Sequence, residues 1–159
     1  MEEATFKSPR DLAFDSNGNL FVLENHSIRK IVFSGASAVV EDFVGNGDWG
    51  YEDGQGTAAR FSEAWNLVID PYDNIFFADM HHNKIRMVTP DAIVTTIAGN
   101  GNWGYSDGLG NNAKFKNPYG LALDANNDLL VNDTENNRIR KVSLSRAVSY
   151  THLTLPTKA

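Results

Sequence analysis

The chain has 159 residues, of which 42% are hydrophobic and 21% are charged, a balance typical of one globular domain with a core. Its 14 basic and 20 acidic residues give a formal net charge of −6, and no basic run stands out, which argues against a nucleic-acid partner. The absence of cysteine excludes disulfides and thiolate metal sites, and no apolar stretch is long enough to span a membrane.

The first segments in chain order belong to a pattern that occurs three times. The segment LAFD ends at Asp15, and the acidic residue Glu24 follows nine residues later. The segment IRKI then begins at Ile28. The same features return at residues 70, 79 and 85 and again at residues 124, 133 and 139. A period of about 40 to 55 residues is typical of repeat arrays and propellers, whose units cannot bury their apolar faces alone.

Two glycine-rich segments separate these units. Residues 45–61 read GNGDWGYEDGQGTAARF and residues 99–115 read GNGNWGYSDGLGNNAKF, so eleven of seventeen positions are identical at a spacing of 54. The glycines predict backbone with positive φ and tight packing. We interpret these segments as links between successive units.

The second unit shows the expected secondary structure most clearly. Four short apolar or alternating runs are separated by turn residues, which predicts strands at Trp65–Ile69, Ile75–Ala78, Lys84–Val88 and Ile93–Ala98. Every connection is too short for a crossover helix, so neighbouring strands must be antiparallel. The sequence therefore predicts an all-β fold with almost no helix: a β-propeller fragment of two and a half to three four-stranded antiparallel blades.

The ends of the chain suggest the extent of the repeat region. We expect a propeller segment over residues 1–147, with repeats at about 4–58, 59–112 and 113–147, and the start falls inside a link, as in a truncated protein. Residues 148–157, VSYTHLTLPT, resemble one reading frame of an adapter used in DNA sequencing libraries, so we interpret 148–159 as not native. The alternative is a native outer strand, because Ser149 to Leu153 alternate in polarity.

The segments that begin at Asp79 and Asp133, DMHHNKIRMV and DTENNRIRKV, resemble the NHL repeat family. The resemblance implies a closed propeller, commonly of six blades, of which this chain supplies a part. The long glycine-rich links resemble the bacterial branch of that family, which implies an exported, extracytoplasmic protein with further domains. The remaining blades of the parent protein are then the first partners of this chain.

Residues that recur in every unit are expected to be structural. Asp side chains cap turns by accepting hydrogen bonds from backbone N–H groups, which is the role predicted for Asp15, Asp70 and Asp124. A recurrent arginine near a blade edge needs an acidic partner. We therefore expect ion pairs between Arg29, Arg86 and Arg140 and the acids Glu24, Asp79 and Asp133.

Candidate binding residues lie in the links and in one turn. Paired aromatic residues on a loop could stack on a sugar or a partner surface, or else pack between blades: Trp49, Tyr51, Trp103 and Tyr105. The pair His81 and His82 occurs in one unit only and is interpreted as an addition to an exposed turn, without the further ligands that a metal site needs.

No cofactor is expected from the sequence, and calcium is the one alternative considered. The link acids Asp48, Glu52, Asp53 and Asp107 could supply oxygen ligands, but the loop lacks the spaced acids of a calcium motif. No nucleophile has a visible base, and no phosphate-binding motif is present.

These observations favour a noncatalytic propeller module that presents its loops to a protein or carbohydrate partner. The alternative is a fragment of a lactonase or lyase with a metal in the central channel, to which Glu24, Asp79 or Asp133 would contribute. Acids or histidines that differ between blades at the ends of the inner strands would favour the enzyme, and uniform residues would favour the scaffold.

Overall fold

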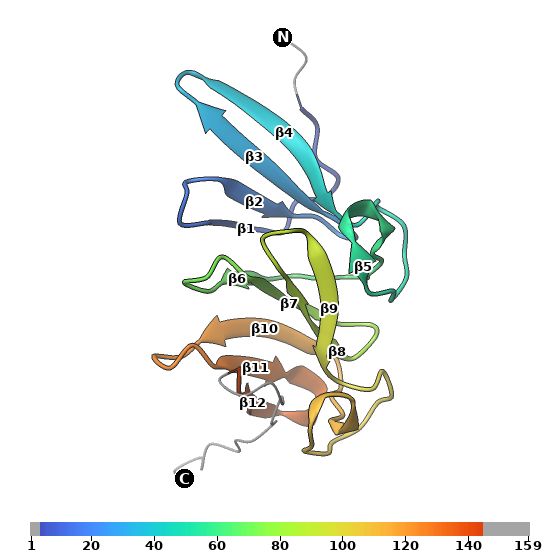
Figure 1. Cartoon of the computed structure of the whole chain (residues 1–159). Helices are drawn as coiled ribbons and strands as arrows, with labels where there is room; N and C mark the ends of the chain where they lie inside the picture. Colours follow the sequence, from blue (N-terminus) through green and yellow to red (C-terminus); the bar gives the residue numbers. More distant parts are fainter. Residues whose placement is uncertain (1–3, 145–159) are drawn as a thin grey trace.

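The computed structural model describes residues 4–144, and the segment 148–159 that we interpreted as adapter-derived lies outside the described residues. Three antiparallel sheets follow one another along the chain and lie stacked in the order of the sequence (Figure 1). Helix is limited to three short 3-10 turns, at Gly56–Ala58, Gly110–Asn112 and Thr134–Asn136. The all-β prediction is confirmed.

The first sheet is a four-stranded meander in the order β1-β2-β3-β4. Its strands are β1 (Asp11–Phe14), β2 (Leu20–Leu23), β3 (Ile28–Ser34) and β4 (Ser37–Val44). Each strand pairs with the next one in the sequence because the turns between them are short. We call this sheet the first blade.

The second sheet contains the next blade, with strands β6 (Leu67–Ile69), β7 (Ile75–Asp79), β8 (Lys84–Val88) and β9 (Ile93–Ala98). The inner strand β6 begins two residues later than predicted, and the Asn66 side chain just before it donates to Asp11 of the first blade. A fifth strand, β5 (Gly54–Gln55), comes from the preceding link and pairs with the outer strand β9. The sequence did not predict β5.

The third sheet consists of β10 (Pro118–Leu123), β11 (Leu129–Asp133) and β12 (Arg138–Val142). It repeats the inner three strands of the other blades, in the order β10-β11-β12. Two apolar layers join the blades. The first contains Phe21, Leu23, Leu67 and Phe77, and the second contains Phe76, Ala78, Leu121 and Val131.

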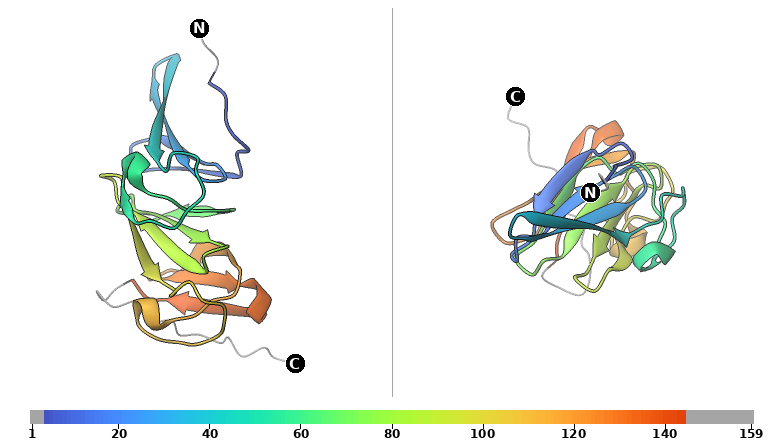
Figure 2. Two further views of the ribbon diagram at one scale, coloured as in Figure 1. Left: turned by 90° about the vertical axis from the view of Figure 1, so that its right-hand side faces the viewer. Right: turned by 90° about the horizontal axis from the view of Figure 1, so that it is seen from above.

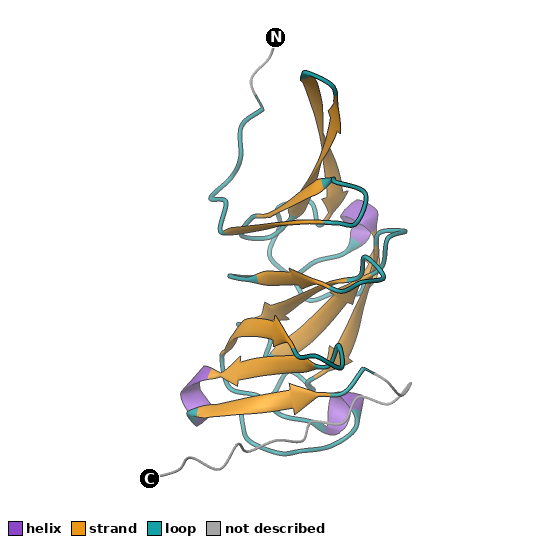
Figure 3. Cartoon of the chain, turned by 90° about the vertical axis from the view of Figure 1, so that its left-hand side faces the viewer, coloured by secondary structure: helices purple, strands orange, loops and turns teal. Residues whose placement is uncertain are grey.

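The aspartates at the ends of the inner strands cap turns as predicted. Asp15 accepts hydrogen bonds from the backbone N–H groups of Asn17 and Asn19, at 2.9 and 2.8 Å. The equivalent Asp70 and Asp124 make the same pair of bonds two and four residues onward. Figure 3 views the molecule from the end that carries these turns. The repeated aspartates are therefore scaffold residues.

A buried arginine fastens each glycine-rich link to the blade that follows it. Arg86 donates from Nη1 to Asp79 at 3.0 Å and from Nη2 to Asp53 and to the Glu52 carbonyl oxygen, both at 2.9 Å. Arg140 forms the same arrangement with Asp133, Asp107 and the Ser106 carbonyl oxygen. Two of the three predicted arginine–acid pairs are thus present.

The third predicted pair, between Arg29 and Glu24, is wrong. Arg29 forms an ion pair with Asp42 at 2.7 Å, and Asp42 is its register partner on β4. Arg86 and Arg140 are held inward by oxygen atoms of a preceding link, whereas Arg29 donates to no such oxygen among residues 4–144 and lies over the Phe6 ring at 5.9 Å. Arg29 therefore turns to the nearest acid on the neighbouring strand.

The first glycine of each link has a strict steric role. Gly99 has φ of +97°, and a Cβ atom there would lie 2.2 Å from the Asn83 carbonyl oxygen. Gly45 has φ of +77°, and its Cβ would lie 2.4 Å from the His26 carbonyl oxygen. Only glycine allows the link to leave the outer strand so close to the neighbouring turn.

Candidate binding surface

The two links and the β2–β3, β7–β8 and β11–β12 turns lie at one end of the blades, which faces the viewer in the left panel of Figure 2. We call this end the link face. Its exposed aromatic residues are Trp49, Tyr51, Trp103 and Tyr105. All four were candidate binding residues, and the fold brings them to the same end of the molecule.

On the first link, Trp49 and Tyr51 lie against the β7–β8 turn of the next blade. Their ring centroids are 4.7 and 5.3 Å from that of His82, and the Lys84 ammonium lies 5.0 Å from the Tyr51 ring. Trp49 nevertheless keeps 62% of its surface exposed. These side chains touch the next blade at its surface and are not buried between blades.

On the second link, Tyr105 lies beside two arginines of the third blade. The Arg138 and Arg140 guanidinium carbons are 4.3 and 5.1 Å from the centre of its ring. Trp103 is 73% exposed. Each link thus presents an exposed tryptophan and a tyrosine that is backed by a cation of the following blade.

The two adjacent histidines have different environments. His81 is exposed and lies 3.1 Å from the Glu63 carboxylate, as expected for a surface turn. His82 is not a surface residue, because its side chain is only 12% exposed and its Nδ1 lies 2.8 Å from the buried Asp79. In the third blade, Asn136 occupies this place and donates to Asp133.

The link acids considered for calcium have other partners. Asp53 accepts from Arg86 and Thr96, and Asp107 accepts from Arg140. Asp48 accepts from Asn46, and Glu52 accepts from the Tyr51 N–H group. Within residues 4–144, no three His, Asp or Glu side chains are grouped closely enough to hold a metal ion.

Three side chains that sequence analysis missed form a stack across the blades. The Arg10 guanidinium lies 3.4 Å from the centre of the Trp65 ring, and Trp65 stacks on Tyr119 with centroids 5.5 Å apart. All three stand four residues after the phenylalanine that ends the link motif, at the start of the inner strand. Aligning the units shows that this position differs in every copy, which is the signal that could have found it.

The carboxylate of Asp73 joins two blades at the opposite end of the molecule. It accepts hydrogen bonds from the Ser16 N–H group at 2.8 Å and from the Ser16 hydroxyl at 2.7 Å. These bonds favour the ionised form and lower the pKa of Asp73 below its ordinary value of 3.8.

No helix of the described segment is long and apolar enough to cross a membrane.

A family model for the NHL repeat matches residues 115–142, which cover β10 to β12. The chain belongs to the NHL repeat family. It is 32% identical over 111 residues to the protein SUPPRESSOR OF QUENCHING 1, chloroplastic, of Arabidopsis thaliana, covering 69% of this chain. It is 36% identical over 72 residues to human NHL repeat-containing protein 2, covering 45% of this chain. Each match covers about a tenth of that relative's length.

Solved structures show that the NHL chain has the propeller fold. An auxiliary nutrient binding protein from Bacteroides ovatus superposes with a TM-score of 0.73 and 27% identity, covering 83% of this chain and 36% of that one. A virginiamycin B lyase from Staphylococcus aureus superposes with a TM-score of 0.61 and 17% identity, covering 96% and 43%. At that lower identity the likeness is one of fold alone.

Proposed function

We propose that this NHL chain is part of a noncatalytic propeller module that binds a protein or carbohydrate partner through its link face. The observation that supports this most directly is the exposure of Trp49 and Trp103, which belong to two links at the same end of the molecule. Large exposed aromatic residues on a rigid scaffold are typical of binding surfaces.

The repetition of the surface supports binding of an extended partner. Each link presents one tryptophan and one tyrosine, and each tyrosine lies beside a cation, Lys84 or Arg138. Arg86 and Arg140, which we call the arginine clamps, hold the links in place. Little conformational entropy is therefore lost when a partner binds. A polysaccharide or a peptide that crosses neighbouring blades would meet the same pair of aromatic side chains twice.

We also propose that the chain is part of a larger, six-bladed ring in an extracytoplasmic protein, with the other blades of that ring as its immediate neighbours. The similarity to a nutrient binding protein of Bacteroides supports both the binding role and this location.

Two of the three acids suggested for a metal-dependent enzyme already bind a cation of their own blade. Asp79 and Asp133 are fully buried and each accepts a hydrogen bond from an arginine. Two positions vary at the inner-strand starts: Arg10, Trp65 and Tyr119 at the first, and Asp11, Asn66 and Gly120 at the second. The one acid among them, Asp11, accepts hydrogen bonds from the Asn66 side chain and the Leu67 N–H group of the next blade. These observations favour the binding module over the lactonase or lyase alternative.

The carbohydrate arm can be tested by affinity electrophoresis through gels that contain xylan, arabinogalactan or mucin. The wild-type chain is expected to be retarded in at least one gel, and the double variant Trp49→Ala, Trp103→Ala is expected to lose the retardation. Tyr72→Ala is the matched control, because Tyr72 is an exposed aromatic residue at a turn between inner strands.

The protein arm can be tested with a photoreactive amino acid at position 103 in the source organism. A defined adduct that disappears when the reactive group is moved to position 72 supports a protein partner. If no gel retards the wild-type chain and position 103 gives no adduct, the proposed function is rejected.

A further inference from the structure

The first blade differs from the second in the length of one turn on the link face. Ile28 stands four residues after Glu24, whereas Ile85 stands six residues after the equivalent Asp79. The two ends of the turns still correspond, because His26 and Asn83 each lie within hydrogen-bond distance of a link carbonyl oxygen, that of Gly47 at 3.1 Å and that of Gly101 at 3.3 Å. The shortened turn therefore lacks residues from its middle.

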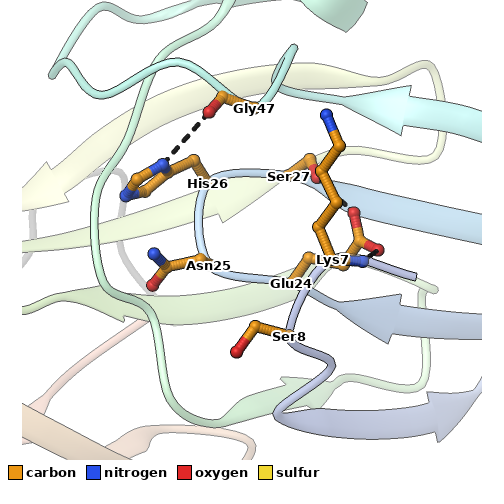
Figure 4. Close-up of a pocket in the computed structure, with 7 residues that line it drawn as sticks. All are labelled: Lys7, Ser8, Glu24, Asn25, His26, Ser27 and Gly47. Atoms are coloured by element: carbon orange, nitrogen blue, oxygen red, sulfur yellow. Dashed lines mark hydrogen bonds between the residues drawn. The ribbon is translucent and has the colours of Figure 1, made fainter.

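The missing residues leave a pocket in the first blade. In the second blade, the residues without a counterpart are Met80 and His81. The next residue, His82, which aligns with Asn25, lies against Asp79 and the aromatic residues of the link. In the first blade, a pocket of about 270 Å3 lies between Lys7–Ser8, the turn from Glu24 to Ser27, and Gly47 (Figure 4). This volume is near the lower end for ligand pockets, which suits a small molecule or a single side chain.

Glu24 is the buried acid of this pocket, with only 3% of its surface exposed. One carboxylate oxygen accepts from the Lys7 backbone N–H group at 2.6 Å, and the other accepts from the Ser27 hydroxyl at 2.7 Å. A carboxylate has about four acceptor positions, so capacity for a further donor remains. Among residues 4–144, no cationic group forms an ion pair with Glu24.

The equivalent acids of the other blades bind guanidinium groups. Asp79 pairs with Arg86 at 3.0 Å and Asp133 pairs with Arg140 at 3.1 Å. The corresponding Arg29 forms its ion pair with Asp42 and leaves Glu24 without a cation. A buried carboxylate without a counter-charge is costly, so a cation that reaches it gains strongly.

We propose that the Glu24 pocket binds an organic cation, a guanidinium or primary ammonium group that takes the place that arginine fills in the other blades. The shortened turn provides the opening, and the unpaired carboxylate provides the charge. Lys7 also lines the pocket but gives Glu24 only its backbone N–H group. Its ammonium therefore competes with the ligand for the site without occupying it.

The test uses agmatine, which carries both kinds of cation, and saturation-transfer difference NMR, which tolerates a self-associating protein. We expect saturable binding to the wild-type chain and at least tenfold weaker binding to Glu24→Gln, with unchanged far-ultraviolet circular dichroism. Glu41→Gln, which removes an exposed acid on β4, is expected to bind like the wild type. Equal binding by wild type and Glu24→Gln, or no binding by wild type, would overturn the proposal.

Two further variants separate the opening from the charge. Inserting Met-His between Glu24 and Asn25 restores the turn length of the second blade and is expected to abolish binding while the carboxylate is kept. Lys7→Met removes the competing ammonium and is expected to tighten binding. Trp49→Ala, which impairs the proposed link face, is expected to leave agmatine binding intact, so the two proposals fail independently.

Discussion

Leu12 and Leu67 occupy the same position of the repeat, but their surroundings differ. Leu67 on β6 is 3% exposed, because Phe21 and Leu23 of the first blade belong to the same apolar layer. Leu12 on β1 is 60% exposed. The comparison shows that the burial of a residue in this fold depends on the neighbouring blade, since the local sequence and strand are alike.

The arginine clamps show the same dependence for charged groups. Arg86 is fully buried with two acids and two carbonyl oxygens around it, whereas Arg29 makes one ion pair with a largely exposed aspartate. One side chain type thus serves as a buried clamp in the second blade and as a surface ion pair in the first.

The largest expected difference comes from removing these two arginines. Arg86→Met should lower the free energy of unfolding by about 3 to 5 kcal/mol, because it leaves Asp79 buried without a counter-charge. Arg29→Met should lower it by less than about 1 kcal/mol, as for other surface pairs. Urea denaturation followed by tryptophan fluorescence measures both. Equal losses in the two variants would contradict the comparison.

The two leucines provide a second matched pair. Leu67→Ala should lower the free energy of unfolding by about 2 to 5 kcal/mol, the usual cost of a cavity in a core. Leu12→Ala should change it by no more than about 0.5 kcal/mol, as for other surface substitutions. The same denaturation measurement applies. A large loss for Leu12→Ala would show that its face is covered in solution, by a second copy of the chain.

The exposed apolar residues of the first blade predict that the chain self-associates. The uncovered face of the first blade exposes Leu12, Phe14, Phe33 and Val39, so the isolated chain is expected to self-associate. The double variant Leu12→Lys, Phe14→Lys should sediment more slowly than the wild type in analytical ultracentrifugation. Tyr72→Lys alters an exposed aromatic residue outside this face and should not change the sedimentation. A monomeric wild-type chain would reject the prediction.

The smallest expected effect concerns the contact between Asp73 and Ser16. Because the pKa of Asp73 is lowered, its ionised form adds stability above pH 3.8, and this contribution is lost as the pH falls through the lowered pKa. Asp73→Asn should therefore be less stable than the wild type at neutral pH, with the gap closing below pH 3.8. Ser16→Ala should reproduce part of the gap. A gap that stays constant down to pH 2 or so would exclude this linkage.

Local features of this fold were predictable, and features that join distant segments were not. The turn aspartates and the pairs of Arg86 and Arg140 follow from residues close together in the sequence. Strand β5 was missed because two residues in a glycine-rich link carry no periodicity. The burial of His82 was missed because the ring that packs on it belongs to Trp49, in another unit of the repeat.

The candidate site was predictable in the same limited sense. The aromatic residues of the links were found from their recurrence, but their common placement at one end depends on the stacking of blades. The Glu24 pocket was missed, although the shorter turn is visible in the sequence. A shorter turn does not reveal whether other side chains fill the space that the absent residues leave. The partner that a buried acid lacks becomes apparent only in three dimensions.

The pairing of β5 with β9 also bears on the order of events during synthesis. Gly54 and Gln55 leave the ribosome well before Val94 and Ile93, their partners in the outer strand. When β9, the outer strand of the second blade, emerges, β5 has therefore already been synthesised and can pair with its free edge. The second blade would then close against a segment made earlier, which shields its exposed edge from pairing with another growing chain.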